Sequence, residues 1–281
     1  KNLKKKMELT APVLVGLGAV VVGCIYIIKS VFLKQGIKLN KKKGQAYELV
    51  EIKELTTGVP NPVTRFRFST GSENASLGLP AGLHIKLEAN IEDEYVVRSY
   101  TPTSTVDTKG HFDLVVKVYP QGKMSQHLAK MSVGDKIDIR GPFGLHEYKA
   151  NTHKKLGFIA GGTGLTPCLQ VIQEICNNPE DKTECSLIYA NVTQDDIIVK
   201  DMIDDLAKKH DKQFKVHYVL DKPPANWTGS EGFVTTNIIK AHLPPPSEEV
   251  KIGMCGPPVM VRFMKKNLDD LGYQKSQYYS Y

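Results

Sequence analysis

The sequence has 281 residues, five cysteines and a formal net charge of +7, which suits two domains and an appendage rather than one small core. Residues 1–43 hold ten of the 37 basic residues but only one acid, Glu8, so the rest of the chain is nearly neutral and shows no nucleic-acid-binding stripe. The odd cysteine count without a C-x-x-C pair argues against a metal cluster or a secreted disulfide framework, and it favours a reducing compartment.

The N-terminal segment, residues 1–34, is predicted to be a membrane anchor. Residues 9–28 form an uncharged, mostly apolar run of about twenty residues, enough for a helix to cross a bilayer. More lysines follow this run than precede it, which places the following domains in the cytosol. A cleaved signal peptide is the alternative, but it would have a shorter apolar region and a small-x-small cleavage site. Residues 35–44 would form a basic tether on anionic lipid.

Residues 45–145 contain short alternating or β-branched runs between turn residues. Six such runs predict a small antiparallel β-barrel. The predicted strands are residues 47–55, 63–69, 84–89, 95–100, 112–119 and 136–140. Before the last strand, residues 122–128 are expected to form a glycine turn that enters a short helix.

Three elements of this domain suit an anion. Arg98, at the end of the fourth strand, offers a rigid fork for a diphosphate. Gly122 and Ser125 lie at a predicted helix N-terminus, which offers free N–H groups. Lys117 is expected on the same strand face as Val115. Alone, Arg98 is better explained as an exposed arginine at a strand end, but the three elements together favour a nucleotide site.

Residues 155–281 alternate strand-like and helical patterns, which predicts a parallel sheet with helices on both faces. Residues 146–154 would link it to the barrel. The predicted helices are residues 168–176, 199–209, 235–241 and 259–271, and predicted strands include residues 186–190, 214–220 and 250–254. Ligands of such sheets bind beyond the carboxyl ends of the strands.

The stretch 155–167 is predicted to be a strand, a glycine turn and a helix that begins near Pro167. Gly161, Gly162 and Gly164 would let a diphosphate approach bare backbone beside the helix N-terminus. Pro167 stands where a G-x-G-x-x-G fingerprint has its third glycine, so an ordinary tight turn is the alternative.

Six strings carry a family resemblance, and they lie at residues 98–104, 114–119, 122–125, 141–144, 160–167 and 255–260. Their order and spacing resemble the ferredoxin–NADP reductase superfamily, and within it the membrane-anchored, yeast-like NADH–cytochrome b5 reductases. The resemblance covers almost all of residues 45–272. It implies a two-domain flavin reductase: a six-stranded antiparallel Greek-key β-barrel that binds FAD, then a Rossmann-like α/β parallel sheet that binds NADH, with an N-terminal transmembrane helix.

The resemblance implies roles for individual residues of the barrel. Arg98 and Ser125 would hold the FAD diphosphate, and Tyr100 would pack against the isoalloxazine. The remaining FAD-binding residues would be Ser99, Thr101, Val115, Lys117, Gly122, Lys123 and Met124. His84 is expected to be structural.

In the second domain the resemblance implies the NADH site and the hydride path. The NADH diphosphate would face Gly162, Thr163 and Gly164. Thr166 would touch both flavin and nicotinamide. Cys255, followed by Gly256 and Pro257, would orient the nicotinamide. No neighbouring histidine or aspartate activates this thiol, which argues against a cysteine hydrolase.

Three outlying residues would contact the adenosine half of NADH. Asp221 would accept hydrogen bonds from the ribose and repel a 2′-phosphate, which favours NADH over NADPH. The alternative is a turn aspartate before Pro223. Phe233, with Trp227, would line the adenosine side, although lone aromatic residues are more often packing.

The implied activity is that of an NADH–cytochrome b5 reductase, a flavoprotein that transfers electrons at the surface of the endoplasmic reticulum or the mitochondrial outer membrane. NADH would give a hydride to FAD, and cytochrome b5 would take the electrons singly. Thr166, Cys255 and Lys117 would be catalytic, and no metal is expected. A rim of lysines would dock the acidic cytochrome: Lys123, Lys149, Lys154 and Lys155. We expect a monomer.

Two alternatives stay open. A related flavin reductase could serve another haem or oxygenase acceptor, although such modules are normally fused to the acceptor domain. A catalytically silent, membrane-tethered module on the same fold would lack an NADH-reducible flavin. The chain ends in an aromatic tail that departs from the Phe-Val-Phe of the family, so no role is predicted for Tyr281.

Overall fold

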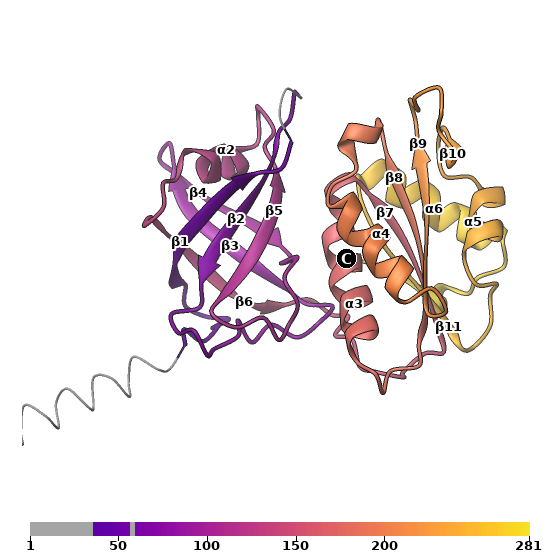
Figure 1. Cartoon of the computed structure of the whole chain (residues 1–281), viewed down its shortest axis with the longest axis horizontal. Coiled ribbons are helices and arrows are strands. Elements are labelled where there is room, and N and C mark those ends of the chain that lie inside the picture. The colour runs from indigo at the N-terminus through magenta and orange to yellow at the C-terminus, as the bar shows by residue number, and fades with distance from the viewer. Residues whose placement is uncertain (1–35, 57–59) are drawn as a thin grey trace, which may run out of the picture.

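The computed structural model describes residues 36–56 and 60–281. They form two six-stranded sheets that lie side by side, one from each half of the chain (Figure 1). The predicted order, an antiparallel sheet and then a parallel one, is confirmed. The predicted anchor lies outside the described residues. Within them, no helix combines the length and apolarity needed to cross a membrane.

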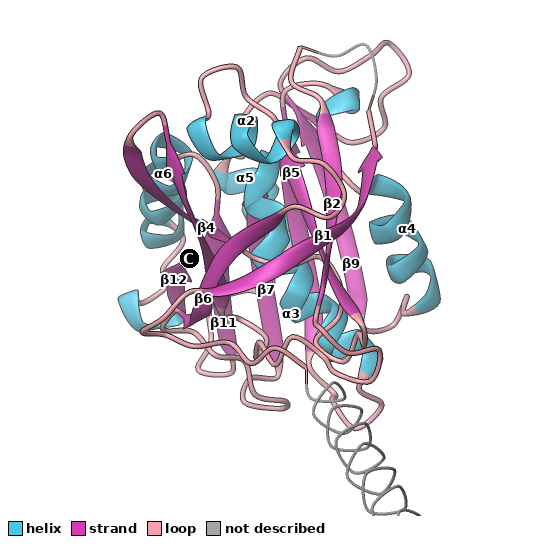
Figure 2. Cartoon of the chain, turned by 90° about the vertical axis from the view of Figure 1, so that its left-hand side faces the viewer, coloured by secondary structure: helices cyan, strands magenta, loops and turns pink. Residues whose placement is uncertain are grey.

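The first sheet is antiparallel, with the strand order β4-β3-β6-β1-β2-β5. Its strands are β1 (Gln45–Glu54), β2 (Val63–Ser69), β3 (His84–Ile91), β4 (Glu94–Tyr100), β5 (His111–Lys117) and β6 (Lys136–Phe143). Each overlaps one of the six predicted strands. No ladder joins β4 to β5 in the described part of the chain, so the sheet is a half-barrel rather than a closed barrel. Helix α2 (Lys123–Lys130) covers one end (Figure 2).

The inner face of the half-barrel is a dense aromatic and aliphatic core. Phe66 and Phe68 alternate with half-buried residues along β2, as a strand with one face toward the core requires. Phe68 stacks on Phe112 of β5 at 5.5 Å, and Tyr47 meets Phe112 edge-on at the same distance. These contacts hold β1 and β2 against β5, the strand that ends at Lys117.

Residues 36–44, the described part of the predicted tether, lie against the half-barrel. The Ile37 N–H donates to the Thr70 carbonyl at 2.7 Å, and the Gly141 N–H donates to the Asn40 carbonyl at 3.2 Å. Ile37 and Leu39 pack on the barrel core. The sequence predicted a basic tether on anionic lipid, but these residues instead pack on the half-barrel. Burial of the two apolar side chains favours this packing.

The second sheet is parallel throughout, with the order β10-β9-β8-β7-β11-β12. Its strands are β7 (Lys155–Gly161), β8 (Glu184–Asn191), β9 (Phe214–Leu220), β10 (Ser230–Glu231), β11 (Val250–Cys255) and β12 (Tyr278–Ser280). The predicted strands and helices are confirmed to within a few residues. β10 and β12 were not expected from the sequence, because both are too short to show a period.

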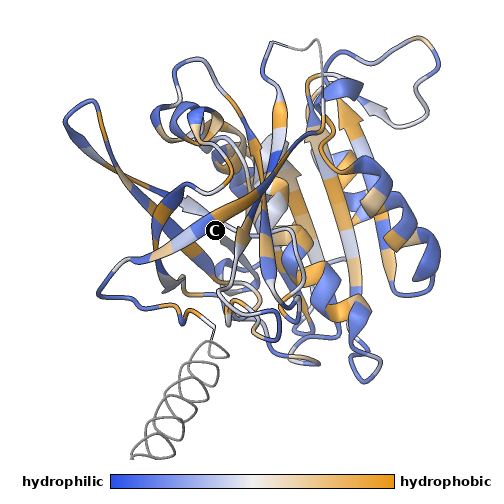
Figure 3. Cartoon of the chain, turned by 60° about the vertical axis from the view of Figure 1, so that its left-hand side comes forward, coloured by the Kyte–Doolittle hydropathy of each residue, from blue (hydrophilic) through white to orange (hydrophobic). Residues whose placement is uncertain are grey.

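Helices cover both faces of this sheet, as its near-continuous apolar strands require (Figure 3). They are α3 (Leu165–Asn177), α4 (Lys200–Lys209), α5 (Thr236–His242) and α6 (Pro258–Asp270). Phe158 of β7 packs in the cluster with α3 and α4, whereas its neighbour Ile159 packs in the cluster with α5 and α6. Alternate residues of one strand therefore serve the two faces.

Apolar packing and a buried hydrogen bond join the two domains. Val63 and Val115 of the half-barrel belong to the same buried cluster as Leu165 of α3. The Gly82 N–H donates to Gln170 Oε1 of α3 at 2.8 Å in a buried hydrogen bond. This shared contact fixes the ends of β4 and β5 close to the start of α3.

Candidate functional site

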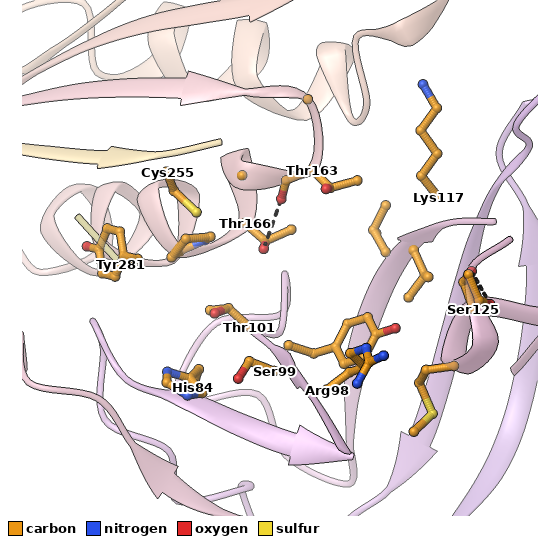
Figure 4. Close-up of a pocket in the computed structure, with 18 of the residues that line it drawn as sticks. His84, Arg98, Ser99, Thr101, Lys117, Ser125, Thr163, Thr166, Cys255 and Tyr281 are labelled. Atoms are coloured by element: carbon orange, nitrogen blue, oxygen red, sulfur yellow. Dashed lines mark hydrogen bonds between the residues drawn. The ribbon is translucent and has the colours of Figure 1, made fainter. Parts of the chain in front are cut away.

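A cavity of about 880 Å³ lies between the two domains. Its volume lies in the range of about 300–1,000 Å³ that is common for cofactor and ligand pockets. One wall comes from the ends of β4 and β5 and the start of α2, and the other from the β7–α3 and β11–α6 turns (Figure 4). The FAD- and NADH-site residues predicted from the sequence all line this cavity except Asp221, Trp227 and Phe233.

Arg98 and Tyr100 end β4 on the barrel wall. Arg98 is exposed, its Nη1 donates to the Val97 carbonyl at 2.8 Å, and it forms no ion pair within the described ranges. Its remaining donors are therefore available to an anion. Tyr100 packs partly on the barrel core, and burial raises its pKa to about 12, so its phenol stays neutral. Ser99 and Thr101 lie on either side, facing the same space (Figure 4).

The start of α2 completes the barrel wall. The Ser125 hydroxyl donates to the Gly122 carbonyl at 3.0 Å and accepts from the Tyr119 N–H at 3.3 Å. The first N–H groups of a helix have no intrahelical acceptor, so those of Lys123 and Met124 are available to a phosphate. The Ser125 side chain shapes this turn. Its predicted contact with a diphosphate stays a prediction.

The glycine turn of the sheet wall requires glycine at two positions. Gly162 has φ +54°, in the left-handed region that side chains rarely adopt. A Cβ on Gly164 would lie 2.4 Å from the backbone carbonyl oxygen of Cys255, so no side chain fits. The Tyr189 hydroxyl of β8 donates to the Gly162 carbonyl at 3.1 Å and holds the turn in place. Bare backbone beside the start of α3 therefore faces the cavity.

Thr166 and Cys255 lie deeper in the sheet wall. Thr166 Oγ1 donates to the Thr163 carbonyl at 3.4 Å, and its side chain faces Thr101 across the cavity (Figure 4). Burial raises the pKa of the Cys255 thiol to about 11, opposed by a hydrogen bond from Gly256. The thiol is neutral near pH 7, which agrees with the expectation that it is not a nucleophile.

Lys117 ends β5 at the cavity, but its ammonium reaches the second domain. Nζ lies 2.5 Å from Asp196 Oδ1, and the side chain extends away from Arg98 (Figure 4). The predicted catalytic role of Lys117 therefore stays a prediction, because this cation already has a carboxylate partner.

The two walls differ in charge. Ionisable side chains of the barrel wall include Arg98, Lys117, Lys123 and Glu94. The residues that line the sheet wall are glycine, threonine, proline, cysteine and tyrosine, and none of them is charged at neutral pH. Lys117 and Lys123 are each paired with a carboxylate, so of these cations Arg98 is the one available to an anion, whereas the sheet wall offers backbone dipoles.

Asp221 and Phe233 lie outside the cavity. Asp221 follows β9 directly, and its N–H donates to the Asn191 carbonyl at 3.1 Å. Phe233 is 80% exposed. Trp227 packs locally, with its indole N–H donating to the Ser230 carbonyl at 3.1 Å. The predicted adenosine contacts of these residues stay predictions.

Tyr281 and His84 are among the cavity-lining residues for which no binding role was predicted from the sequence. Tyr281 arrives there because β12 pairs with β11, and its N–H donates to the Met254 carbonyl at 3.1 Å. The only sequence signal was the aromatic tail itself. His84, expected to be structural, also lines the cavity. Burial and then the charge of Lys86 lower its pKa, so it is neutral at pH 7.

Comparison with known proteins agrees with this geometry. Residues 49–148 match the family model of the oxidoreductase FAD-binding domain, and residues 158–266 match that of the oxidoreductase NAD-binding domain. NADH-cytochrome b5 reductase 1 of Candida albicans is 50% identical over 250 residues, which is 88% of this chain and 84% of that protein. The chain belongs to the NADH–cytochrome b5 reductase family.

One further relative matches nearly the full length of this chain, and one solved structure matches its fold. The Dictyostelium discoideum NADH-cytochrome b5 reductase 1 is 41% identical and covers 96% of this chain and 97% of its own length. The cytochrome b5 reductase domain of Ulva prolifera nitrate reductase has a TM-score of 0.81 at 37% identity, covering 86% of this chain and 99% of that domain. The predicted family is thereby confirmed.

The cavity fits the two nucleotides that the reductase family models name. The barrel wall presents a free guanidinium and a helix N-terminus, which are donors for a diphosphate. The sheet wall presents a turn in which Gly162 and Gly164 leave the backbone uncovered. Because both walls bound one space, two ligands held on them meet inside it.

Proposed function

We propose that this chain transfers electrons from NADH, through FAD held on the half-barrel, to cytochrome b5. The observation that carries the proposal is one cavity shared by both domains, with Arg98 outside any ion pair on the barrel wall and an uncharged glycine turn on the sheet wall. Both walls suit a nucleotide diphosphate, since a guanidinium binds it through charge and a glycine turn binds it through backbone N–H groups.

Bound FAD supplies the chemistry, since it accepts a hydride from NADH and releases electrons singly. The residues of this chain supply position. Arg98 and the start of α2 bind the diphosphate on the barrel wall, and the turn at Gly162–Gly164 binds the diphosphate on the sheet wall. Thr166 and Cys255, both neutral, line the cavity on the sheet wall. Hydride transfer requires a donor–acceptor separation of about 3–3.5 Å, and no protein acid or base is needed for it.

Cytochrome b5 as the acceptor is supported by the relatives, which are NADH-cytochrome b5 reductases. The predicted lysine rim gives weaker support, because Lys123 pairs with Glu94, Lys154 with Glu249, and Lys155 with Glu184. These exposed pairs reduce the local positive field that would attract an acidic partner. A modest fall in turnover with rising salt is expected, and salt-independent turnover would remove the docking proposal.

We also propose that residues 1–34 anchor the enzyme in the endoplasmic reticulum or the mitochondrial outer membrane, with both domains in the cytosol and the chain monomeric. The support is the uncharged apolar run at residues 9–28 and the lysines that follow it. Resistance to carbonate extraction, together with cleavage of both domains by protease added to sealed membranes, is the expected result. Release by carbonate would contradict the anchor.

Anaerobic titration of the purified protein tests the central proposal. NADH should bleach the flavin absorbance stoichiometrically, NADPH should do so much less well, and added cytochrome b5 should restore the oxidised spectrum while its haem is reduced. A colourless protein, or a flavin that NADH does not bleach, would favour the silent module. A bleached flavin that does not reduce cytochrome b5 would favour another acceptor.

A further inference from the structure

Asp196 does not line the cavity, yet it makes the only ion pair between the two domains within residues 36–56 and 60–281. Its partner is Lys117, the last residue of β5, and the two atoms Nζ and Oδ1 lie 2.5 Å apart. The two residues are 79 positions apart in the chain. The Lys117 side chain is 14% exposed and that of Asp196 is 27% exposed, so solvent screens this pair less than an ordinary surface pair.

The Asp196 carboxylate is held in place from its own side. Oδ2 accepts hydrogen bonds from the Thr193 N–H at 3.0 Å and the Thr193 hydroxyl at 2.8 Å, in a capping box of the 3₁₀ turn Gln194–Asp196. Ile197 and Ile198, which follow, are buried in the sheet-domain core. Burial alone raises the pKa of Asp196, but the hydrogen bonds from Lys117 and Thr193 outweigh it and hold the pKa below its usual value.

The same strand connects Asp196 to the glycine turn. Asp196 follows β8, and β8 carries Tyr189, whose hydroxyl donates to the Gly162 carbonyl. On the barrel side, Val115 lies two residues before Lys117 and packs in the core cluster of the second domain. The ion pair therefore joins the strand that lines the barrel wall to the strand that supports the sheet wall.

We propose that Asp196 is a positioning residue, which holds Lys117 and thereby sets the spacing of the two walls that hydride transfer requires. The inference rests on the proposed function, because it concerns the distance between a ligand on each wall. A donor and an acceptor held on different domains keep their separation only if the domains keep theirs.

Removing the carboxylate charge should slow hydride transfer without loss of flavin. In the full-length FAD-bound protein, NADH at saturation should bleach the flavin of Asp196→Asn about tenfold more slowly than that of the wild type. This loss is smaller than the roughly hundredfold loss that a misplacement of about 1 Å can cause. Asp196→Glu should recover most of the rate, because it keeps the charge. Asp195→Asn, at the exposed neighbouring position, is the matched control and should bleach at the wild-type rate.

A second measurement separates positioning from a general loss of structure. The primary isotope effect with deuterated NADH should depend more steeply on temperature in Asp196→Asn than in the wild type, because a looser spacing must be compressed for transfer. If Asp196→Asn does not fold, Thr193→Val, which removes one of the hydrogen bonds to the carboxylate, should show the same changes at smaller size.

Several results would overturn the inference. They are a wild-type bleaching rate in Asp196→Asn, a deficit that vanishes at saturating NADH, an unchanged isotope effect, and loss of FAD from the variant. A wild-type flavin that NADH does not bleach would instead overturn the proposed function itself, so the two failures are distinguishable.

Discussion

The two walls of the cavity offer a nucleotide different means of binding, although each includes the start of a helix. The barrel wall uses a free guanidinium at Arg98 and the first turn of α2. The sheet wall uses the backbone of Gly162–Gly164, packed so closely on the Cys255 carbonyl that no Cβ fits at Gly164. One wall thus relies on charge, and the other relies on the absence of side chains.

This difference implies different sensitivities. Charge acts over several ångströms and weakens with salt, so the barrel wall should tolerate small shifts but lose affinity when its cation is removed. Close backbone approach tolerates no added atoms but depends little on salt. The following substitutions test whether each wall fails in its own way.

The largest effect is expected from Gly164→Ala on the sheet wall. The added Cβ must displace the glycine turn or the Cys255 backbone, which moves the NADH-facing surface by a substantial part of an ångström. NADH-dependent bleaching should fall about a hundredfold, while the bound flavin remains. Gly78→Ala, on the other domain, meets no atom within 4 Å but has a φ of +71°, so it should cost some stability while leaving bleaching unchanged. Equal bleaching by both variants would contradict the close-packing account.

The next largest effect is expected from Arg98→Leu on the barrel wall. Hydrogen bonds to a charged group contribute about 1.5–3 kcal/mol, so FAD should bind roughly 10–100 times more weakly, as measured by flavin fluorescence on dilution. Arg98→Lys should recover part of the affinity, and Arg262→Leu, exposed on α6, should lose none. The wild type should release FAD more readily as salt rises. Retention of FAD by Arg98→Leu would show that charge does not hold it.

A smaller effect is expected outside the cavity, at the end of β9. Asp221→Asn removes a half-exposed negative charge that would repel a 2′-phosphate. The preference for NADH over NADPH, measured as the ratio of kcat/KM values, should fall by about five- to tenfold. Asp211→Asn, on the turn before β9, is the control. An unchanged ratio would mean that Asp221 only closes its turn.

The thiol on the sheet wall should contribute little pH dependence. Because burial raises the pKa of Cys255 to about 11, the thiol stays protonated from pH 6 to pH 9. The bleaching rate should therefore be flat over that interval, and Cys255→Ser should lower the rate a few-fold without changing the shape of the profile. A rise in rate toward pH 9 that Cys255→Ser abolishes would indicate a thiolate role.

The smallest effect concerns stability, away from both walls. The rings of His217 and His242 stack at 3.4 Å, and burial lowers the pKa of each, aided at His217 by the charge of His242. Histidines with a lowered folded-state pKa cost stability as the pH falls below about 6.5, because the unfolded chain binds protons first. Thermal unfolding at pH 5.5 should therefore begin earlier than at pH 7.5, and less so in His242→Gln.

Local patterns in the sequence determined most of the architecture. Burial on one face makes apolar and polar residues alternate in β2 and β5, and burial on both faces makes β7 a continuous apolar run. Both patterns can be recognised in the sequence. Glycine and proline marked the turn that became half of the site, because backbone geometry limits what can stand there. Arg98 and Cys255 were identified through strings with the spacing of a known family.

Tertiary structure alone decided the features that join distant segments. Tyr281 reaches the cavity only because β12 pairs with β11, and residues 36–44 dock on the half-barrel through Ile37 and Leu39. The pairing of Lys117 with Asp196 spans two domains, so neither residue shows a local signal of its partner. A period or a turn signal reports only on near neighbours in the chain. Contacts between distant segments depend on how whole elements pack, and that information is spread over the entire sequence.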